Sequence, residues 1–345
     1  MWTIINFIHT FGLIELFIIF FVMANIITFG LYALDEHKVA MGLRGINDKV
    51  LIFFSLGCGG FGAFLGILNY RHKTIKTNLL IAMIIGLFIA NIPLVHIVHS
   101  FTLDRTIIYK EIDFYSKNWP KDLDGYRIGF ITDKHKITHL DMAAVVTELN
   151  NRNLDLLLLG GDFSIRNSHY QGTLREISQT ITADGIFGVE GNHDIYTRLF
   201  RAKEQYGIIP LDNSGVTIRN GFFLAGVQDL WNRNPDIEEA IAGASADDFI
   251  LLISHNPDVA MMQPTSGIDL IVAGHTHRGQ ITFFGYSFYL LRGSISDYGT
   301  KFAYGFSYSN EGTPVFTSSG VGVYYSWPRI FARPEVVIFT MYNIE

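Results

Sequence analysis

Three long apolar segments without a charged residue dominate the first third of this chain. They run from Leu16 to Leu34, from Val50 to Tyr70 and from Asn78 to Leu103. A helix needs about 20 apolar residues to cross the hydrocarbon core of a bilayer, and a cleaved signal peptide would supply only one such segment. Three of them are rare in soluble domains. The sequence therefore predicts a retained, multi-pass, integral membrane region over residues 1–103.

The basic residues around these segments leave two arrangements open. If all three segments cross, the two loops between them lie on opposite sides and their positive charges nearly cancel. The next basic residues then favour a cytoplasmic C-terminal domain under the positive-inside rule; they are Arg105, Lys110, Lys117 and Lys121. If the glycine-rich segment Val50–Tyr70 instead re-enters the membrane, both basic loops are cytoplasmic and the C-terminal domain lies outside. We favour the cytoplasmic arrangement.

The remainder of the chain has the composition of an ordinary globular domain. Residues 104–125 are polar and are predicted to form a linker that begins with an edge strand, and residues 126–345 to form a catalytic domain. Short apolar runs alternate there with helical patterns, which predicts packed α/β layers. Five of the runs are predicted strands: Tyr126–Thr132, Leu154–Leu159, Gly185–Val189, Phe249–Ile253 and Ile268–Ala273.

Each predicted strand is followed at once by side chains that can bind metal. They are Asp133 and His135, then Asp162, then Asn192 with His193 and Asp194, then His255 and Asn256, and finally His275 and His277. Ligands gather at the carboxyl ends of the strands in open α/β sheets, and two ions about 3.5–4 Å apart are the usual two-metal arrangement. Mixed imidazole and carboxylate donors suit Mn, Fe or Zn better than Mg or Ca alone. The pattern predicts two divalent metal ions, with Mn²⁺ favoured and Fe, Zn or Mg as alternatives.

The order Asp-x-His, Gly-Asp, Gly-Asn-His-Asp, Ser-His, Gly-His-x-His resembles the calcineurin-like metallophosphoesterases over about residues 120–345. The resemblance implies a four-layer α/β/β/α sandwich and hydrolysis of a phosphoester or pyrophosphate. It implies one metal held by Asp133, His135, Asp162 and His277. It implies a second held by Asp162, Asn192, His255 and His275, with Asp162 bridging the two. His193 would face the substrate as general acid, with Asp194 orienting its ring.

Two narrower resemblances concern the membrane. Ser254-His255-Asn256-Pro257-Asp258 and the stretch Gly274–Gln280, with Arg329 near the end, resemble a bacterial branch of membrane-associated phosphodiesterases. That branch includes enzymes that cleave UDP-diacylglucosamine. Residues 20–80, with Leu31–Asp35 and Arg71-His72-Lys73-Thr74, resemble a small bacterial membrane domain of unknown function.

Three arginines are candidate phosphate contacts: Arg166, Arg278 and Arg329. Arg166 follows the Gly-Asp motif where the family usually has an acidic residue. Arg278 stands where the branch usually has glycine, and a guanidinium there can bind phosphate with two hydrogen bonds. An outward, solvated Arg278 is the equally simple alternative.

The substrate is predicted to be lipid-linked, with membrane lipids as partners. Residues 283–331 are rich in aromatics, including Phe284 and Trp327, which suits a membrane interface, although an aromatic β-core explains them as well. A soluble nucleotide or other small phosphoester is the enzymatic alternative, and an inactive membrane scaffold or sensor is the non-enzymatic one. The net charge of −6 and the lack of a Lys/Arg block predict no nucleic-acid partner.

Overall fold

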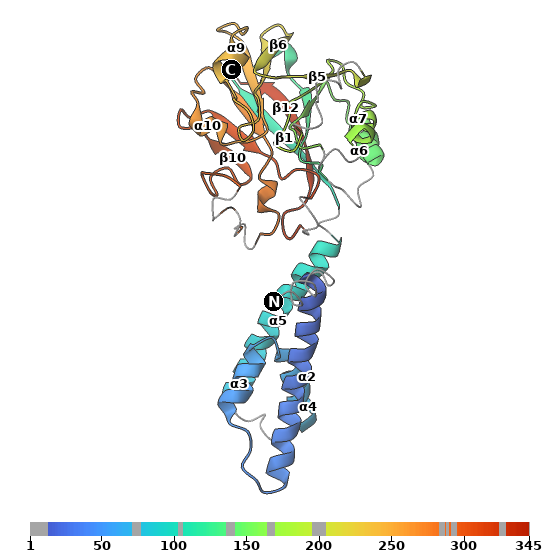
Figure 1. Cartoon of the computed structure of the whole chain (residues 1–345), viewed down its shortest axis with the longest axis vertical. Coiled ribbons are helices and arrows are strands. Elements are labelled where there is room, and N and C mark those ends of the chain that lie inside the picture. Colours follow the sequence, from blue (N-terminus) through green and yellow to red (C-terminus); the bar gives the residue numbers. More distant parts are fainter. Residues whose placement is uncertain are drawn as a thin grey trace. The chain divides into compact units, whose positions relative to one another are not determined.

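A computed structural model describes residues 13–70, 77–102, 106–135, 142–163, 170–194, 205–282, 287, 290, 295–323 and 329–344. The chain forms two compact units, Met1–His99 and Ser100–Glu345, which are drawn together in Figure 1. Arg166 and the aromatic residues predicted at positions 283, 284, 286, 288, 289, 324, 325 and 327 lie outside the described residues.

The N-terminal unit is helical. Its helices are α2 (Leu13–Ala40), α3 (Asp48–Leu56), α4 (Gly60–Tyr70) and α5 (Thr77–Thr102). Within the described residues one stretch, Ile18–Ala40 of α2, is long and apolar enough to cross a membrane by length and composition; Gly60–Tyr70 and Thr77–Ile89 are shorter apolar helices. One candidate span is thus found where the sequence predicted three.

The predicted span Val50–Tyr70 is wrong as a single crossing helix, because it is broken at residues 57–59. Cys58 has φ of 70°, a left-handed conformation that ends a helix. The break leaves backbone groups without helical partners, and polar side chains of α2 satisfy them. Asn25 donates from Nδ2 to Cys58 O at 2.9 Å and accepts from Gly62 N at 2.8 Å, while the Thr28 hydroxyl donates to Phe54 O at 3.4 Å.

The same contacts give the directions of the short helices. Phe54 lies beside Thr28 and Ile46, just before α3, donates to Asp35 Oδ1 at 2.6 Å, so α3 runs antiparallel to α2. Gly62 lies beside Asn25, and a Cβ on Gly66 would lie 2.6 Å from Tyr32 Cβ, so α4 runs in the direction of α2. α3 and α4 therefore run in opposite directions and form a helical hairpin beside α2, which can be followed in Figure 1.

The second unit contains two six-stranded mixed sheets. The first sheet has the order β1-β12-β2-β3-β4-β5 and the second β10-β11-β9-β8-β7-β6. In the first, β2, β3, β4 and β5 are parallel; in the second, β7, β8, β9 and β11 are parallel. The strands are β1 (Ile108–Ser116), β2 (Tyr126–Ile131), β3 (Leu156–Leu159), β4 (Ile186–Gly188), β5 (Ile208–Pro210), β6 (Ser214–Arg219), β7 (Phe222–Gly226), β8 (Phe249–Ser254), β9 (Leu270–Ala273), β10 (Gly305–Tyr308), β11 (Pro314–Thr317) and β12 (Glu335–Asn343).

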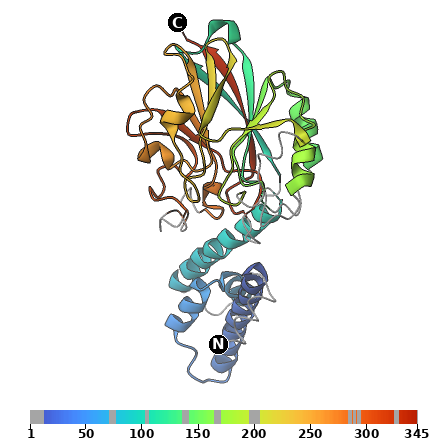
Figure 2. The same ribbon diagram turned by 45° about the horizontal axis from the view of Figure 1, so that its top comes forward.

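Three buried clusters show how these sheets are covered. One lies between the sheets, because it joins Phe130 and Leu158 of the first to Leu251 and Val272 of the second. The other face of the first sheet packs on α6 (Met142–Asn150) and α7 (Tyr170–Ile177). The other face of the second packs on α9 (Ile237–Ile241) and α10 (Val259–Met262). In Figure 2 the green helices and the orange helical turns lie on opposite flanks of the strands. The predicted α/β class is confirmed.

The first sheet begins before the predicted domain boundary at residue 126. Strand β1 lies inside the predicted linker 104–125 and pairs in parallel with β12 from Ile108↔Glu335 to Ser116↔Asn343. Alternate side chains of β1 are exposed, so the segment is polar enough to resemble a connector in the sequence. Its partner is the last strand of the chain, a pairing that local sequence pattern does not reveal.

Candidate metal centre

The predicted ligands follow five strand ends. Asp133 and His135 follow β2, Asp162 follows β3 and Asn192 follows β4; His255 follows β8, and His275 and His277 follow β9. Because β2, β3 and β4 are parallel neighbours, as are β8 and β9, the carboxyl ends of each set lie together. The two sheets face each other across one core, which brings both sets of ends to the same place.

The first cluster contains Asp133, His135 and His277, whose ligand atoms all lie within 4.8 Å of one another and whose side chains are buried. His135 Nε2 lies 2.9 Å from His277 Nε2, and His277 Nε2 lies 3.4 Å from Asp133 Oδ1. Ligand atoms bound about 2.0–2.2 Å from one ion are separated by about 3.0–3.5 Å along the edges of its coordination shell. The distances between these ligand atoms therefore fit three side chains that bind one cation.

The second cluster contains Asp162, His255 and His275, with the same limit of 4.8 Å between ligand atoms. Asn192 joins it, because its Oδ1 lies 3.0 Å from His255 Nε2 and 3.0 Å from His275 Nδ1. Asp162 also reaches the first cluster: its Oδ2 is 3.2 Å from His255 Nε2 and 3.4 Å from His135 Nε2. One carboxylate oxygen thus lies at contact distance from a ligand atom of each cluster.

Backbone carbonyls set the ring orientations in the second cluster. His255 Nδ1 lies 2.8 Å from Gly160 O, and His275 Nε2 lies 3.0 Å from Ile295 O. A carbonyl oxygen can only accept, so these nitrogens carry the protons. The opposite nitrogens then face Asp162 and Asn192, which is the usual arrangement of a metal-binding histidine.

The ligand loops have an unusual backbone. Five of the seven predicted ligands have positive φ: Asp133 55°, His135 41°, Asp162 58°, His275 68° and His277 50°. Each such non-glycine residue costs about 1–2 kcal/mol, and strain of this kind clusters at functional sites. Close packing adds to the constraint. A side chain at Gly191 would collide with the Asp162 carboxylate, and one at Gly274 with that of Asp133.

Burial and neighbouring charges set the protonation of the histidines in both clusters. It lowers the pKa of His135 to about 4 and that of His275 to about 3, so both rings are neutral at pH 7, the form that binds metal. Burial also opposes the charged form of His255, but the adjacent Asp162 carboxylate outweighs it and raises the pKa of that ring well above its ordinary value. A proton therefore lies between two predicted metal ligands, and a cation would displace it.

His193 and Asp194 lie at this centre with different surroundings. The backbone N–H of His193 donates to Asp162 Oδ1 at 2.8 Å, and its half-buried ring lies edge-on to His135 with centroids 5.2 Å apart. Asp194 accepts backbone hydrogen bonds from Asp162 N at 2.5 Å, Phe163 N at 2.9 Å and Gly191 N at 3.0 Å. The Asp194 side chain therefore links the loop of Asp162 to the loop of Asn192 by hydrogen bonds.

The arginines lie in two kinds of surroundings. Arg329 is 2% exposed, and its guanidinium donates to the carbonyls of Gly322, Ala332 and Ser319 and lies 3.3 Å from His277 Nδ1. Arg278 is half-buried and stacks on Tyr304, with its Cζ 4.3 Å from the ring centroid. These contacts place Arg329 behind a predicted ligand, and they hold Arg278 against an aromatic ring.

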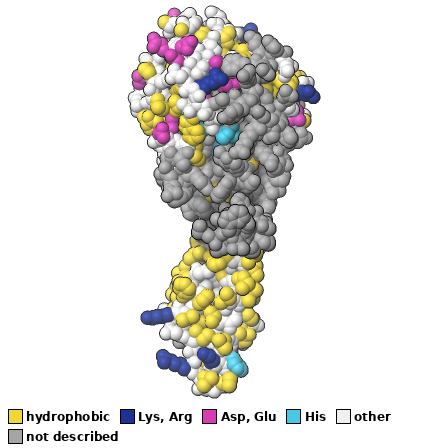
Figure 3. All heavy atoms as spheres, in the orientation of Figure 1, with side chains coloured by type: hydrophobic (Ala, Val, Ile, Leu, Met, Phe, Trp, Pro, Cys, Tyr) yellow, Lys and Arg dark blue, Asp and Glu magenta, His cyan; other side chains and the backbone are white. Residues whose placement is uncertain are grey.

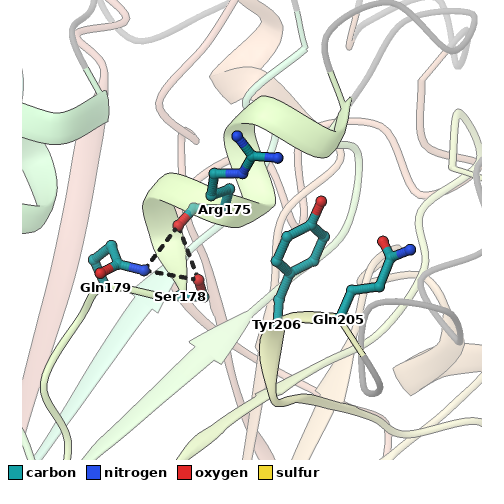
Figure 4. Close-up of a pocket in the computed structure, with 5 residues that line it drawn as sticks. All are labelled: Arg175, Ser178, Gln179, Gln205 and Tyr206. Atoms are coloured by element: carbon teal, nitrogen blue, oxygen red, sulfur yellow. Dashed lines mark hydrogen bonds between the residues drawn. The ribbon is translucent and has the colours of Figure 1, made fainter.

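Sequence reasoning missed the loop that follows β7. Trp231 lies edge-on to His275, with ring centroids 4.4 Å apart, and the Asn232 side chain donates to Asn192 O at 2.9 Å. This loop is distant in sequence from the ligand motifs, and none of the motifs named above lies in it. A polar pocket lined by Arg175, Ser178, Gln179, Gln205 and Tyr206 is drawn in Figure 4; no predicted metal ligand lines it.

Comparison with known proteins agrees with this geometry. The sequence profile of the calcineurin-like phosphoesterases matches residues 126–279, and that of a protein family of unknown function, DUF1294, matches residues 25–78. An uncharacterized metallophosphoesterase of Campylobacter jejuni is 26% identical over 310 residues, which cover 84% of this chain and 78% of the relative.

Two further relatives are more partial. An uncharacterized metallophosphoesterase of Bacillus subtilis is 28% identical over 245 residues, covering 64% of this chain and 81% of the relative. A Danio rerio protein described as a transmembrane protein with metallophosphoesterase domain is 26% identical over 249 residues, covering 66% of this chain and 55% of the relative. Residues 126–279 therefore form a calcineurin-like phosphoesterase domain, and the protein is a hydrolase that acts on phosphoesters.

Proposed function

We propose that the two clusters hold two divalent metal ions and that the protein hydrolyses a phosphodiester or pyrophosphate bond. The observation that carries the proposal is the position of Asp162, whose Oδ2 lies within 3.4 Å of a ligand atom of each cluster. The first ion is assigned to Asp133, His135, Asp162 and His277. The second is assigned to Asp162, Asn192, His255 and His275. Their mixed donors favour Mn²⁺, with Fe, Zn or Mg as alternatives.

The chemistry divides between the ions and the chain. Two bound divalent ions offset charge on the phosphoryl oxygens and make hydroxide available near neutral pH. His193 is assigned to proton donation to the leaving oxygen, because its ring lies at the edge of the first cluster, beside His135. Such a general acid contributes about 10²–10⁴-fold. Asp194 contributes by holding the backbone around Asp162.

Metal-dependent hydrolysis tests this proposal. The full-length protein, purified in detergent, should hydrolyse bis(p-nitrophenyl) phosphate, lose that activity on chelation and regain it when about two equivalents of Mn²⁺ are restored. Activity that survives complete metal removal would contradict the proposal. Bound metal without hydrolysis of any phosphoester would instead favour the inactive scaffold or sensor.

We also propose that the N-terminal unit lies in a membrane, with α2 and α5 crossing and the α3–α4 hairpin re-entering. At 1.5 Å per residue, the 28 residues of α2 and 26 of α5 are about 40 Å long, enough for a hydrocarbon core of about 30 Å. The 9 and 11 residues of α3 and α4 reach only about half of it. Large apolar side chains face outward, with Ile26 59%, Phe53 70% and Phe88 73% exposed, and Figure 3 shows hydrophobic side chains over this unit.

This arrangement supports an orientation opposite to the one favoured from the sequence. With two crossings, the start of α2 and the end of α5 lie on one side. The end of α2, the loop after it and the start of α3 would lie on the other side together with residues 71–76. That side would then hold six basic residues: Lys38, Arg44, Lys49, Arg71, Lys73 and Lys76. The positive-inside rule makes that side cytoplasmic. We therefore propose that the catalytic unit lies outside the cytoplasm.

Cysteine labelling in intact cells tests the orientation. Cys58 is first replaced by Gly, which suits its positive φ. A membrane-impermeant thiol reagent should then label Ser214→Cys, an exposed position of β6, as fully in intact cells as in lysed ones. Met41→Cys, 61% exposed in the α2–α3 loop, should react only after lysis. The reverse pattern would restore the cytoplasmic arrangement.

A lipid-linked phosphate is the substrate we propose, with membrane lipids as partners. The support is the short connection: α5 ends at Thr102 and β1 begins at Ile108, and tethering raises the effective concentration of a substrate in the same membrane. In vesicles, the full-length protein should hydrolyse diacylglycerol pyrophosphate, and diluting this lipid with phosphatidylcholine at constant bulk amount should slow it. Faster hydrolysis of a soluble nucleotide, with no effect of dilution, would favour the alternative substrate class.

A further inference from the structure

Trp231 is a half-exposed aromatic residue held beside the second cluster. Its side chain is 51% exposed, and its ring lies 4.4 Å from that of His275, nearly perpendicular at 86°. Single exposed apolar residues are common on protein surfaces. What distinguishes Trp231 is therefore its position beside a predicted metal ligand and the way in which its backbone is fixed.

The loop of Trp231 is fastened to the ligand loops at several points. Asp229, only 1% exposed, accepts hydrogen bonds from Trp231 N at 3.1 Å and Asn232 N at 2.9 Å. Asn232 donates to Asn192 O at 2.9 Å. Arg233 pairs with the buried Glu190 at 3.4 Å. The indole is thus presented on a rigid support, so that little further ordering is needed when a ligand contacts it.

We propose that Trp231 is a specificity residue that stacks on a flat aromatic ring, such as a nucleobase, esterified to the phosphate held at the metal centre. The inference rests on the proposed two-metal function. A phosphate bound beside His275 would place its ester group within reach of the indole, and stacking of a base on an aromatic side chain contributes about 1–3 kcal/mol. The ring would belong to the polar part of a lipid-linked substrate, because the residues after Trp231, Asn232 and Arg233, are polar and offer no apolar surface for an acyl chain.

The test compares two phosphates that differ by a base. Calorimetry on the full-length, Mn²⁺-loaded protein measures the dissociation constants of adenosine 5′-monophosphate and ribose 5-phosphate. We expect the nucleotide to bind about tenfold more tightly, within the range of one stacked base. Trp231→Ala should bring the two constants within about twofold by weakening the nucleotide alone, and Trp231→Phe should keep most of the difference.

A matched control and two contrary outcomes complete the test. Tyr308→Ala removes an exposed aromatic side chain of β10, 60% exposed, and should leave both constants unchanged. An unchanged preference in Trp231→Ala, or no preference in the wild type, would overturn the role of Trp231 while leaving the two-metal proposal intact. Failure of both phosphates to bind the metal-loaded protein would overturn the two together.

Discussion

The two candidate metal-binding clusters both contact Asp162 but hold their histidines differently. In the second cluster, His255 and His275 direct their far nitrogens to the carbonyls of Gly160 and Ile295, which turns the other nitrogen of each ring toward the site. In the first, the far nitrogen of His277 faces the guanidinium of Arg329 at 3.3 Å. A guanidinium can only donate, so this nitrogen accepts, and the proton of the neutral ring lies on the side of the cluster.

This difference predicts unequal metal affinities. In the second cluster the carbonyl partners raise the basicity of both rings. His275 is already in the form that a cation needs, and the proton that a cation must displace from His255 lies beside the Asp162 carboxylate. At His277 a cation must displace a proton and approach a buried positive charge. We therefore expect the second cluster to retain its ion more tightly, and the first cluster to exchange it more readily.

The largest effect is expected from Asp162→Asn, which removes the carboxylate common to both clusters. The amide keeps the size but loses the charge, so both ions should bind weakly. Loss of a residue that merely supports a ligand costs about 10–100-fold, so hydrolysis of bis(p-nitrophenyl) phosphate should fall by more than about a hundredfold. Metal analysis of the purified variant is the parallel measurement. Two tightly bound ions with normal turnover would remove Asp162 from the account.

Single-ligand variants separate the clusters. His277→Gln should leave about one ion that resists brief chelation, because the second cluster is intact. His255→Gln should leave an ion that the same chelation removes. Elemental analysis after timed exposure to chelator gives both results. Equal retention in the two variants would mean that the different partners of the histidines do not affect affinity.

Replacing His193 should separate catalysis from metal binding. His193→Ala should lower turnover on an alkyl phosphodiester by about a hundredfold while both ions remain bound. A nitrophenyl ester should suffer less, since nitrophenolate leaves without a proton. If metal content falls in step with turnover on both substrates, His193 is a ligand instead of a proton donor.

The smallest effect concerns Arg329, which lies beside His277 of the first cluster. Arg329→Gln removes donors from three buried carbonyls, at about 1 kcal/mol for each lost hydrogen bond, and frees His277 Nδ1. We expect a lower melting temperature and about a tenfold change in metal affinity at the first cluster alone. Matched titrations of His277→Gln and His255→Gln backgrounds assign the affected ion. An equal change in both clusters would make Arg329 a general structural residue.

In the catalytic part, the sequence predicted those features that depend on residues close together in the chain. An apolar strand followed by Asp162 or His255 is visible in a short window, and parallel pairing then brings such ends together. The partners of Arg329 could not be foreseen, because they are backbone carbonyls from separate loops, and no residue type marks a carbonyl acceptor. For the same reason the support of Trp231 was invisible.

In the membrane part, the sequence predicted the helices but not their arrangement. Apolar composition predicted helices in residues 1–103, but it could not tell a crossing helix from a hairpin. The difference depends on Asn25 and Thr28, whose side chains satisfy the backbone at the break near Cys58. Glycines made re-entry an open alternative, and only the contacts between helices gave their directions. The edge strand predicted in the linker is present as β1, but its pairing with β12, far along the chain, could not be read from local sequence.

The central claim is that Asp162 joins two metal ions, and anomalous diffraction tests it most directly. Crystals of the full-length protein grown with Mn²⁺ should show two anomalous peaks about 3.5–4 Å apart. One should lie among Asp133, His135 and His277, the other among Asn192, His255 and His275, with the Asp162 carboxylate between them. A single peak, or two peaks that do not share Asp162, would contradict the account.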